Sequence, residues 1–291
     1  MFAQQLVNGL LLGVTYALVA LGFTLIVGVL GLLNLALGET FMVSAFAGLL
    51  LMTVVGLPFP VAFAGAMLVG ATVSAAVYVV SFRAVRKEYF AAPILSTVGV
   101  GIMLTATVAR VLGSEHRAMP EAVPNLSYQL GSVRIFLPHV VVLAVAVVLT
   151  AGLYLLVNRT KLGMAIRAVA ESPPTAALLG VPVERVIFVT FLLAGALAGA
   201  SGVLTGLVFR TVSPFIGFDA TLKGLSIMVI GGLGNVAGAI LAALLIGFVE
   251  VLSVAYLSAT MRDAIIFGLL IVVLLFRPQG LLGTHTHQER M

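Results

Sequence analysis

The sequence predicts an all-α protein, a polytopic transmembrane helical bundle of about eight to nine spans with broken helices. Of its 291 residues, 62% are hydrophobic and 9% are charged, whereas soluble domains carry about 25% charged residues. Long uncharged runs separate the charges, and most are long enough for the roughly 20 residues that cross a bilayer. The runs lack the alternating pattern of barrel strands, so helices are the structure that satisfies their backbone in lipid. In chain order the runs are 1–38, 40–82, 89–109, 135–158, 186–209, 224–249 and 264–276.

The run 40–82 predicts two spans rather than one. Gly56, Pro58 and Pro60 interrupt it, and proline inside a helix removes a hydrogen bond and clashes with the preceding turn. No polar segment between the runs is long enough for a soluble domain. We therefore expect residues 1–291 to form a single membrane domain.

Basic residues in the short loops predict the orientation, because cytoplasmic loops carry an excess of lysine and arginine. The loop after residue 82 and the loop 159–186 are positive, whereas residues 113–138 balance basic against acidic side chains. We expect the first two loops to be cytoplasmic and 113–138 to be external. The basic residues of the two positive loops are Arg83, Arg86, Lys87, Arg159, Lys161, Arg167 and Arg185.

Arg277 and Arg290 predict a cytoplasmic C-terminus. Two simple spans after Lys223 would place the C-terminus outside, so we expect an extra or broken pass between residues 224 and 276. Three glycines followed by an asparagine predict the position of the break, because glycine lets the backbone leave helical geometry. These residues are Gly231, Gly232, Gly234 and Asn235.

A second break is predicted at residues 34–39, where Asn34 and Gly38 precede Glu39, the first carboxylate of the chain. Non-helical backbone inside a membrane is tolerated only against protein or a water-filled cavity, and a carboxylate there is functional by default. The alternative is that Glu39 bonds a freed backbone amide at its own break. We expect the two breaks to flank a translocation path. The candidate path residues are Asn34, Glu39, Ser96, Thr97, Gly231, Gly232, Gly234 and Asn235.

Few other ionisable groups are expected inside the membrane. Ser96 and Thr97 have the alternative role of satisfying helix backbone. Arg110 and Lys223 stand at the ends of predicted spans and are expected to snorkel to the external interface. Glu250 lies near another span end and is expected to be solvated. Glu39 would then be essentially the one buried ionisable group of the chain.

Residues 172–180 predict a short capped helix of about seven residues. Ser172 is a good N-cap, Pro173 suits the first helical position, and Gly180 can end the helix in a left-handed conformation. Isolated helices under about 12 residues are marginal in water, so this one must pack on its own bundle or in a groove of another subunit. The residues assigned to such a coupling surface are Glu171, Ser172, Ala176, Ala177, Leu178, Leu179 and Gly180.

The composition and motifs narrow the function. The sequence has no Gly-x4-Gly-Lys-Ser/Thr phosphate loop, so ATP hydrolysis is expected on another subunit and the chain is not expected to be an enzyme. It has no cysteine, which excludes disulfides and thiolate metal sites, and no metal or other cofactor is expected. We attribute the net charge of +5 to basic residues at the cytoplasmic side of the membrane and not to nucleic-acid binding. The N-terminal residues MFAQQ carry no lysine or arginine, so a cleaved signal peptide is not expected.

The loop 163–186, GMAIRAVAESPPTAALLGVPVERV, resembles the cytoplasmic coupling loop of bacterial ATP-binding-cassette importer permeases, specifically the branched-chain amino acid permease family of the LivH type. NLALGE at 34–39 resembles the Asn-x-Ala-x-Gly-Glu segment of that family. In one departure, Thr175 stands where the general importer motif has glutamate, and Gly180 follows at a shorter spacing. Further matches are STVGVGIML at 96–104, SPFIGFDATLKGL at 213–225, GGLGNVAGAILAALLIG at 231–247 and FRPQGLLG at 276–283.

The resemblance implies a permease subunit in a bacterial inner membrane. Its implied partners are a second homologous permease, two cytoplasmic ATPase subunits and an extracytoplasmic substrate-binding protein, together with membrane lipid. The implied substrates are branched-chain or other hydrophobic amino acids, with urea and short amides as alternatives. A secondary ion-coupled carrier is the alternative class, and such carriers commonly bury paired ionisable groups.

Overall fold

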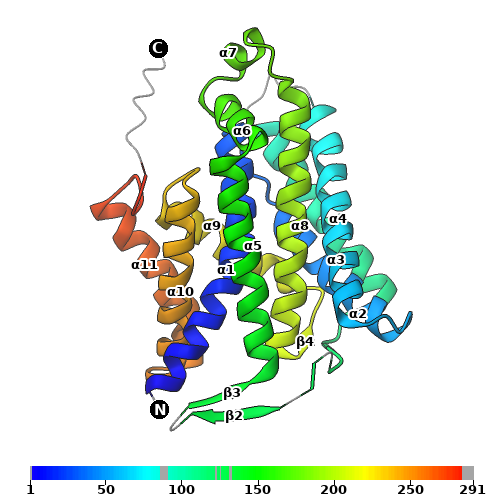
Figure 1. Cartoon of the computed structure of the whole chain (residues 1–291), viewed down its shortest axis with the longest axis vertical. Helices are drawn as coiled ribbons and strands as arrows, with labels where there is room; N and C mark the ends of the chain where they lie inside the picture. The colour runs from blue at the N-terminus through cyan, green and yellow to red at the C-terminus, as the bar shows by residue number, and fades with distance from the viewer. Residues whose placement is uncertain (1, 86–90, 122, 125, 131–132, 284–291) are drawn as a thin grey trace.

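The computed structural model describes residues 2–85, 91–121, 123–124, 126–130 and 133–283. These residues form a bundle of helices with four short strands (Figure 1). The helices are α1 (Phe2–Leu30), α2 (Leu37–Thr53), α3 (Phe59–Val77) continued by the π-helix η1 (Tyr78–Arg83), α4 (Ala91–Leu112), α5 (Leu137–Arg159), α6 (Lys161–Glu171), α7 (Pro173–Leu178), α8 (Val183–Phe209), α9 (Ile216–Gly231), α10 (Val236–Tyr256), the 3-10 helix η2 (Ala259–Met261) and α11 (Arg262–Phe276). The strands are β1 (Arg117–Ala118), β2 (Ser127–Leu130), β3 (Val133–Phe136) and β4 (Thr211–Val212).

Within the described residues, seven helices are long and apolar enough to cross a membrane, and α2, with 17 residues, is a shorter apolar helix. The predicted polytopic helical bundle is confirmed. The predicted division of the run 40–82 is also confirmed, because α2 ends at Thr53 and α3 begins at Phe59, with Gly56 at φ +73° between them. The seven long helices are α1, Phe59–Arg83, α4, α5, α8, α10 and Ala259–Phe276.

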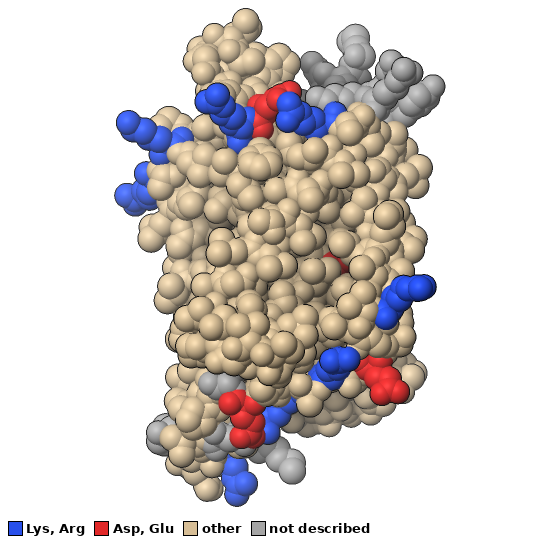
Figure 2. All heavy atoms as spheres, turned by 90° about the vertical axis from the view of Figure 1, so that its right-hand side faces the viewer, with Lys and Arg blue, Asp and Glu red and all other residues tan. Residues whose placement is uncertain are grey.

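The two predicted loops lie at opposite ends of the bundle. The helices α6 and α7 of the loop 159–186 lie at one end, and the hairpin of β2 and β3 in the loop 113–138 lies at the other (Figure 1). Basic and acidic side chains lie at both ends of the bundle, and a broad, largely uncharged band separates the two ends (Figure 2). Arg86, Lys87 and Arg290, which also entered the orientation argument, lie outside the described residues. The cytoplasmic placement of the α6–α7 end stays a prediction from the positive-inside rule.

The helices α9, α10 and α11 supply the extra or broken pass that the charge pattern requires. α9 and α10 are separate helices with a break at residues 232–235, as predicted. α11 follows α10, and its C-terminal end points toward the α6–α7 end of the bundle (Figure 1). The chain therefore leaves α11 on the side predicted to be cytoplasmic.

Small residues bring the backbones of the central helices into contact. α1 packs against α8, α9 and α10, and α3 packs along α8. A Cβ atom on Gly247 of α10 would lie 2.4 Å from the backbone nitrogen of Gly13 in α1, and one on Gly195 of α8 would lie 2.3 Å from the carbonyl oxygen of Gly70 in α3. Close approach of this kind is how membrane helices associate in the absence of a hydrophobic driving force.

Candidate functional site

The short helix α7 forms where its capping residues predict it. The Ser172 Oγ atom accepts a hydrogen bond from the Thr175 backbone N–H at 3.4 Å, and Pro173 occupies the first turn. Gly180 has φ +82°, and its N–H donates to the Ala177 carbonyl at 3.0 Å. The predicted helix in residues 172–180 is confirmed. Its N-cap and its glycine end are local features of the sequence, so no tertiary contact is needed to define its limits.

Two sides of α7 have different surroundings. Ala176 is 2% exposed and packs in a small apolar cluster with Val29, Ile166 and Val169. Leu178 and Leu179 are 88% and 78% exposed. One side of the helix therefore packs on its own bundle, while two leucines at its C-terminal end have no contact that would account for their apolar surface.

The preceding helix α6 supports α7. Thr160 caps α6 by accepting a hydrogen bond from the Gly163 N–H at 3.1 Å, and Arg167 donates to the carbonyl of Val157 in α5. Glu171, the last residue of α6, is exposed, as are Ala177 and Gly180 beyond it. The loop 159–186 is thus a folded helical pair fixed to α5, with its polar and leucine-bearing surface facing away from the bundle.

The break around Asn34 is an irregular segment between α1 and α2, and neighbouring helices satisfy its backbone. The Leu35 N–H donates to Thr97 Oγ1 of α4 at 3.1 Å, and Thr221 Oγ1 of α9 lies 3.4 Å from the Leu35 carbonyl oxygen as a donor. Asn34 is fully buried, and its Oδ1 atom accepts from the Ala36 N–H at 3.1 Å. The Asn34 Nδ2 atom has no hydrogen-bond partner. The segment is held in a junction between α4 and α9, and it leaves one buried donor unused.

Glu39 lies in the first turn of α2, where the helix dipole favours a negative charge. It is 8% exposed, and its Oε2 atom has no hydrogen-bond partner. The carboxylate faces Gly101 of α4, since a Cβ atom added there would lie 3.4 Å from Oε2. Next to it, Gly38 packs on α9 so closely that a Cβ would lie 2.2 Å from the Gly217 carbonyl oxygen. Asn34 and Glu39 therefore border the same α4–α9 junction.

The two candidate polar residues of α4 have different surroundings. Thr97 is buried and bonds the Asn34 segment through Leu35, and its own hydroxyl donates to the Ile94 carbonyl at 2.7 Å. Ser96 instead donates to Ser81 of η1 at 3.0 Å. The structure thus brings Thr97 to the junction and places Ser96 against η1.

The α9–α10 break has a covering of its own. Asn235 caps α10 by accepting from the Gly238 N–H at 2.9 Å, and its Nδ2 atom donates to the Leu282 carbonyl at 2.6 Å. The N–H groups of Leu281 and Leu282 donate to the carbonyls of Ile230 and Gly231 at 2.7 and 3.1 Å. The turn after α11, residues 277–283, therefore satisfies this break, a contact that the sequence analysis missed although Pro278 and Gly280 signal a turn there.

The two breaks meet opposite halves of α9. The segment 34–39 contacts Gly217 and Thr221 near the start of α9. The break 232–235 follows the end of α9, where Gly234 approaches Gly28 of α1. Gly231, Gly232, Gly234 and Asn235 therefore form one group and Asn34, Glu39 and Thr97 form another, without a contact between the two groups among the described hydrogen bonds.

A buried ion pair corrects two expectations. Lys223 does not snorkel and Glu250 is not solvated: they are 8% and 3% exposed, and the Lys223 Nζ atom lies 2.7 Å from Glu250 Oε1. The same oxygen accepts from the Tyr16 hydroxyl at 3.2 Å and lies 3.5 Å from the Arg262 guanidinium. The expectation that Glu39 is essentially the one buried ionisable group is therefore wrong. By contrast, Arg110 is exposed two residues before the end of α4.

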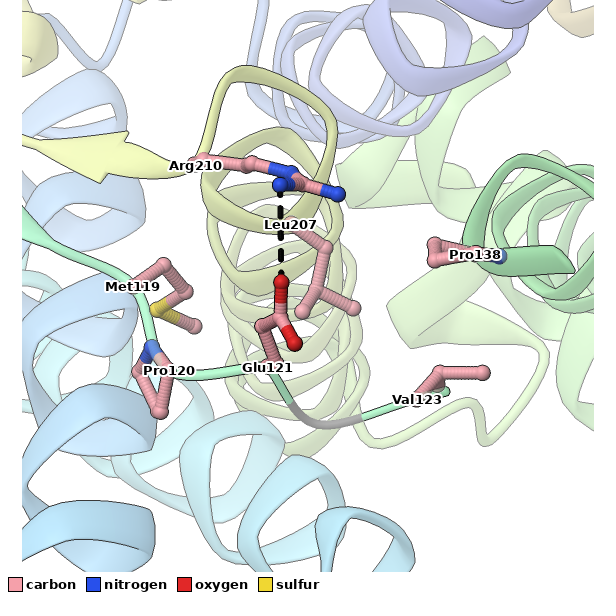
Figure 3. Close-up of a pocket in the computed structure, with 7 residues that line it drawn as sticks. All are labelled: Met119, Pro120, Glu121, Val123, Pro138, Leu207 and Arg210. Carbon is pink, nitrogen blue, oxygen red and sulfur yellow. Dashed lines mark ion pairs between the residues drawn. The ribbon is translucent and has the colours of Figure 1, made fainter. Parts of the chain in front are cut away.

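A small pocket of about 20 Å³ lies at the end predicted to be external (Figure 3). Arg210 ends α8 in a left-handed conformation with φ +55°, and its carbonyl accepts from the Met119 N–H at 3.0 Å, beside the pairing of β1 with β4. Its guanidinium faces Glu121 at 3.6 Å across the pocket. Both side chains are exposed, so this pair adds little stability.

A larger apolar groove of about 630 Å³ lies between α1, α5 and α10. Its lining includes Leu10, Val14, Val147 and Leu244. Asn34, Glu39 and Thr97 do not line this groove, so it is separate from the polar junction at Glu39.

Comparison with known proteins identifies the family. Residues 5–274 match the family described as "Branched-chain amino acid transport system / permease component". The chain is 35% identical to the high-affinity branched-chain amino acid transport system permease protein BraD of Pseudomonas aeruginosa, over 97% of this chain and 96% of BraD. It is 35% identical to the permease protein LivH of the corresponding high-affinity system of Escherichia coli K12, with the same coverage.

The fold is similar to that of a solved structure, PsaBC from Streptococcus pneumoniae in complex with Fab. The TM-score is 0.54 at 12% sequence identity, over 94% of this chain and 91% of that chain. This likeness concerns the fold alone. The family match and the similarity to BraD and LivH over 97% of this chain lead to the conclusion that the chain belongs to the branched-chain amino acid transport permease family and is a multi-pass permease component of an ATP-binding-cassette transporter, without the catalytic role of an ATPase.

Proposed function

We propose that this permease carries branched-chain or other hydrophobic amino acids into the cytoplasm. A permease component of this class functions with an ATPase and other transporter components. In the proposed assembly these are a second homologous permease, two cytoplasmic ATPase subunits and an extracytoplasmic binding protein that delivers the substrate. Substrate names of the similar proteins support the amino acid assignment, and urea or a short amide is the alternative cargo.

The observation that carries the proposal is the exposed leucine pair of α7. Leu178 and Leu179 extend from a capped helix at the basic end of the bundle, and α6 fixes that helix to α5. A short helix with an apolar end of this kind fits a hydrophobic groove of a partner. The proposed ATPase-coupling residues are Glu171, Ser172, Ala176, Ala177, Leu178, Leu179 and Gly180.

The proposed translocation path passes the breaks in the helices. Buried polar groups and irregular backbone at membrane depth need protein or water beside them. Asn34 and Glu39 meet this description most clearly, because each keeps a buried polar atom without a partner. The proposed path residues are Asn34, Glu39, Ser96, Thr97, Gly231, Gly232, Gly234 and Asn235.

A charge in the coupling surface tests the ATPase assignment. In Leu178→Asp, the aspartate would enter the apolar groove of the partner, where a mismatched anchor often costs about 2 kcal/mol or more. We expect the ATPase to be lost from the purified complex while membrane insertion stays normal. Leu233→Asp is the matched control, because Leu233 is an exposed leucine in the α9–α10 turn. Equal co-purification of the ATPase with both variants would contradict the assignment.

The buried Lys223–Glu250 pair is the observation that favours the second candidate, an ion-coupled carrier. Proteoliposomes with the complete complex separate the two candidates. We expect leucine uptake to require ATP and the binding protein, and to continue when ionophores remove proton and sodium gradients. Concentrative uptake by this chain alone, driven by an ion gradient, would establish the carrier instead.

A further inference from the structure

We propose that Glu39 and Asn34 form a recognition site for the zwitterionic head of the transported amino acid, with Glu39 accepting its α-ammonium group and the Asn34 amide donating to its α-carboxylate. This inference rests on the proposed function, because it assigns chemistry to one part of the proposed path. It concerns the junction of the 34–39 segment with α4 and α9.

Two buried polar atoms at this junction have no hydrogen-bond partner. The Asn34 Nδ2 atom is a donor and the Glu39 Oε2 atom is an acceptor, and both are buried without a hydrogen-bond partner. A buried polar atom without a partner is unfavourable, and most such atoms in folded proteins are paired. The two residues that carry these atoms, Asn34 and Glu39, are five positions apart in the sequence. A free amino acid carries the complementary groups, an ammonium donor and a carboxylate acceptor, on a single carbon atom.

The fold holds both side chains in place. The Asn34 Oδ1 atom is held by the Ala36 N–H at 3.1 Å, so the other end of the amide is left to donate. Glu39 is held in the first turn of α2, and its carboxylate faces Gly101. A Cβ atom at Gly101 would come into van der Waals contact with the carboxylate, so α4 presents backbone and no side chain to Glu39 at this point.

Neither a basic side chain nor a metal site accompanies Glu39 among the described residues. The described part of the chain contains no ion pair to Glu39, whereas Glu250 has Lys223 and Arg262. Among the described residues no group of three His, Cys, Asp or Glu side chains could hold a metal ion. An organic cation in transit is therefore the partner that fits the uncompensated carboxylate.

The test uses the complete transporter in proteoliposomes, with its binding protein supplied at saturating concentration. Uptake is compared for leucine and for 2-hydroxy-4-methylpentanoate, which has a hydroxyl in place of the ammonium. Because the same binding protein delivers each compound to each variant, its own selectivity cancels when the uptake ratio of the two compounds is compared between variants. The variants are Glu39→Gln, Glu39→Asp and the control Glu115→Gln, which makes the same chemical change at an exposed carboxylate.

We expect Glu39→Gln to lower leucine uptake about tenfold or more and to raise the ratio of hydroxy acid to leucine by a similar factor, where tenfold corresponds to about 1.4 kcal/mol. Glu39→Asp keeps the charge and should recover part of the uptake. Glu115→Gln should resemble the wild type. Asn34→Asp replaces the donor by an acceptor and should lower leucine uptake more than uptake of leucinamide, which lacks the carboxylate.

An unchanged hydroxy acid to leucine ratio in Glu39→Gln would overturn the recognition site while leaving the proposed function intact. Background uptake of the hydroxy acid in both the wild type and Glu39→Gln would overturn it as well. The same holds if Glu39→Asp loses as much uptake as Glu39→Gln. If Glu39→Gln does not assemble, the Asn34→Asp comparison decides. A wild-type complex that imports no amino acid under ATP would instead overturn the proposed function and the recognition site together.

Discussion

Glu250 and Glu39 are both buried carboxylates of this bundle, but only Glu250 has cationic side chains beside it among the described residues. The Oε1 atom of Glu250 meets Lys223, Tyr16 and Arg262, so one carboxylate joins α1, α9, α10 and α11. Glu39 has no cation among the described ion pairs. Each leaves its Oε2 atom unbonded. Since removing a charge from water is costly unless another charge compensates it, the comparison separates a carboxylate that holds helices together from one whose charge the fold leaves uncompensated.

The largest expected effect comes from removing the cation beside Glu250. Lys223→Met leaves the Glu250 charge without its closest partner, and breaking a buried pair in this way costs about 3–5 kcal/mol. We expect a marked fall in the free energy of unfolding, measured by denaturation in detergent. The double variant Lys223→Met/Glu250→Leu should recover most of the loss, because it removes both charges. Wild-type stability in Lys223→Met would contradict the structural role of the pair.

A side chain opposite Glu39 should have the next largest effect. Gly101→Leu places a bulky group against the carboxylate, since even a Cβ atom would lie 3.4 Å from Oε2. Overpacking typically costs about 1–3 kcal/mol. Gly99→Leu is the matched control, because no atom lies within 4 Å of the Cβ position at Gly99. Comparing the thermal midpoints of the two variants measures the effect, and equal midpoints would show that the space at Gly101 is not restricted.

Neutralising each carboxylate should change stability with opposite signs. Glu39→Gln removes an uncompensated charge and should leave stability unchanged or raise it by about 1 kcal/mol. Glu250→Gln removes the negative charge that compensates Lys223 and Arg262 and should lower stability. Unfolding of the two variants under the same conditions gives the comparison. A loss in Glu39→Gln as large as in Glu250→Gln would mean that the two carboxylates have the same structural role.

The smallest expected effect concerns the outer contact of Glu250. Arg262 lies 3.5 Å from the carboxylate, and its side chain is 35% exposed. Solvent screens such a contact, so Arg262→Gln should cost about 0–1 kcal/mol. Repeating the measurement at high salt should reduce the difference from the wild type. A cost as large as that of Lys223→Met would show that Arg262 is a full member of the buried cluster.

Local signals were sufficient to predict several elements of this fold. Ser172, Pro173 and Gly180 define α7 within a few residues of one another, and Gly56 with Pro58 separates α2 from α3. Uncharged length predicted the long spans. In each case the physical cause, a cap, a breaker or a hydrophobic length, lies inside the element itself.

Contacts between segments far apart in the sequence could not be predicted from local sequence signals. Lys223 and Glu250 lie 27 residues apart on separate helices, and uncharged length alone does not indicate which way each side chain faces around its helix. The same limit applies to Asn34, whose position in the sequence suggested a break but not its contacts with α4 and α9. Ser96 and Thr97 are adjacent in sequence, yet only the structure shows that they face different helices.

The turn at residues 277–283 has a consequence for biogenesis. The carbonyls of Ile230 and Gly231 are satisfied by N–H groups of Leu281 and Leu282, which are synthesised after all of the helices that the structure describes. During translation, α9 and α10 therefore reach the membrane with their connecting break still open. Closure of that break needs residues 281 and 282, so a chain cut after α11 would contain all of the helices that the structure describes and would still lack the donors for these two carbonyls.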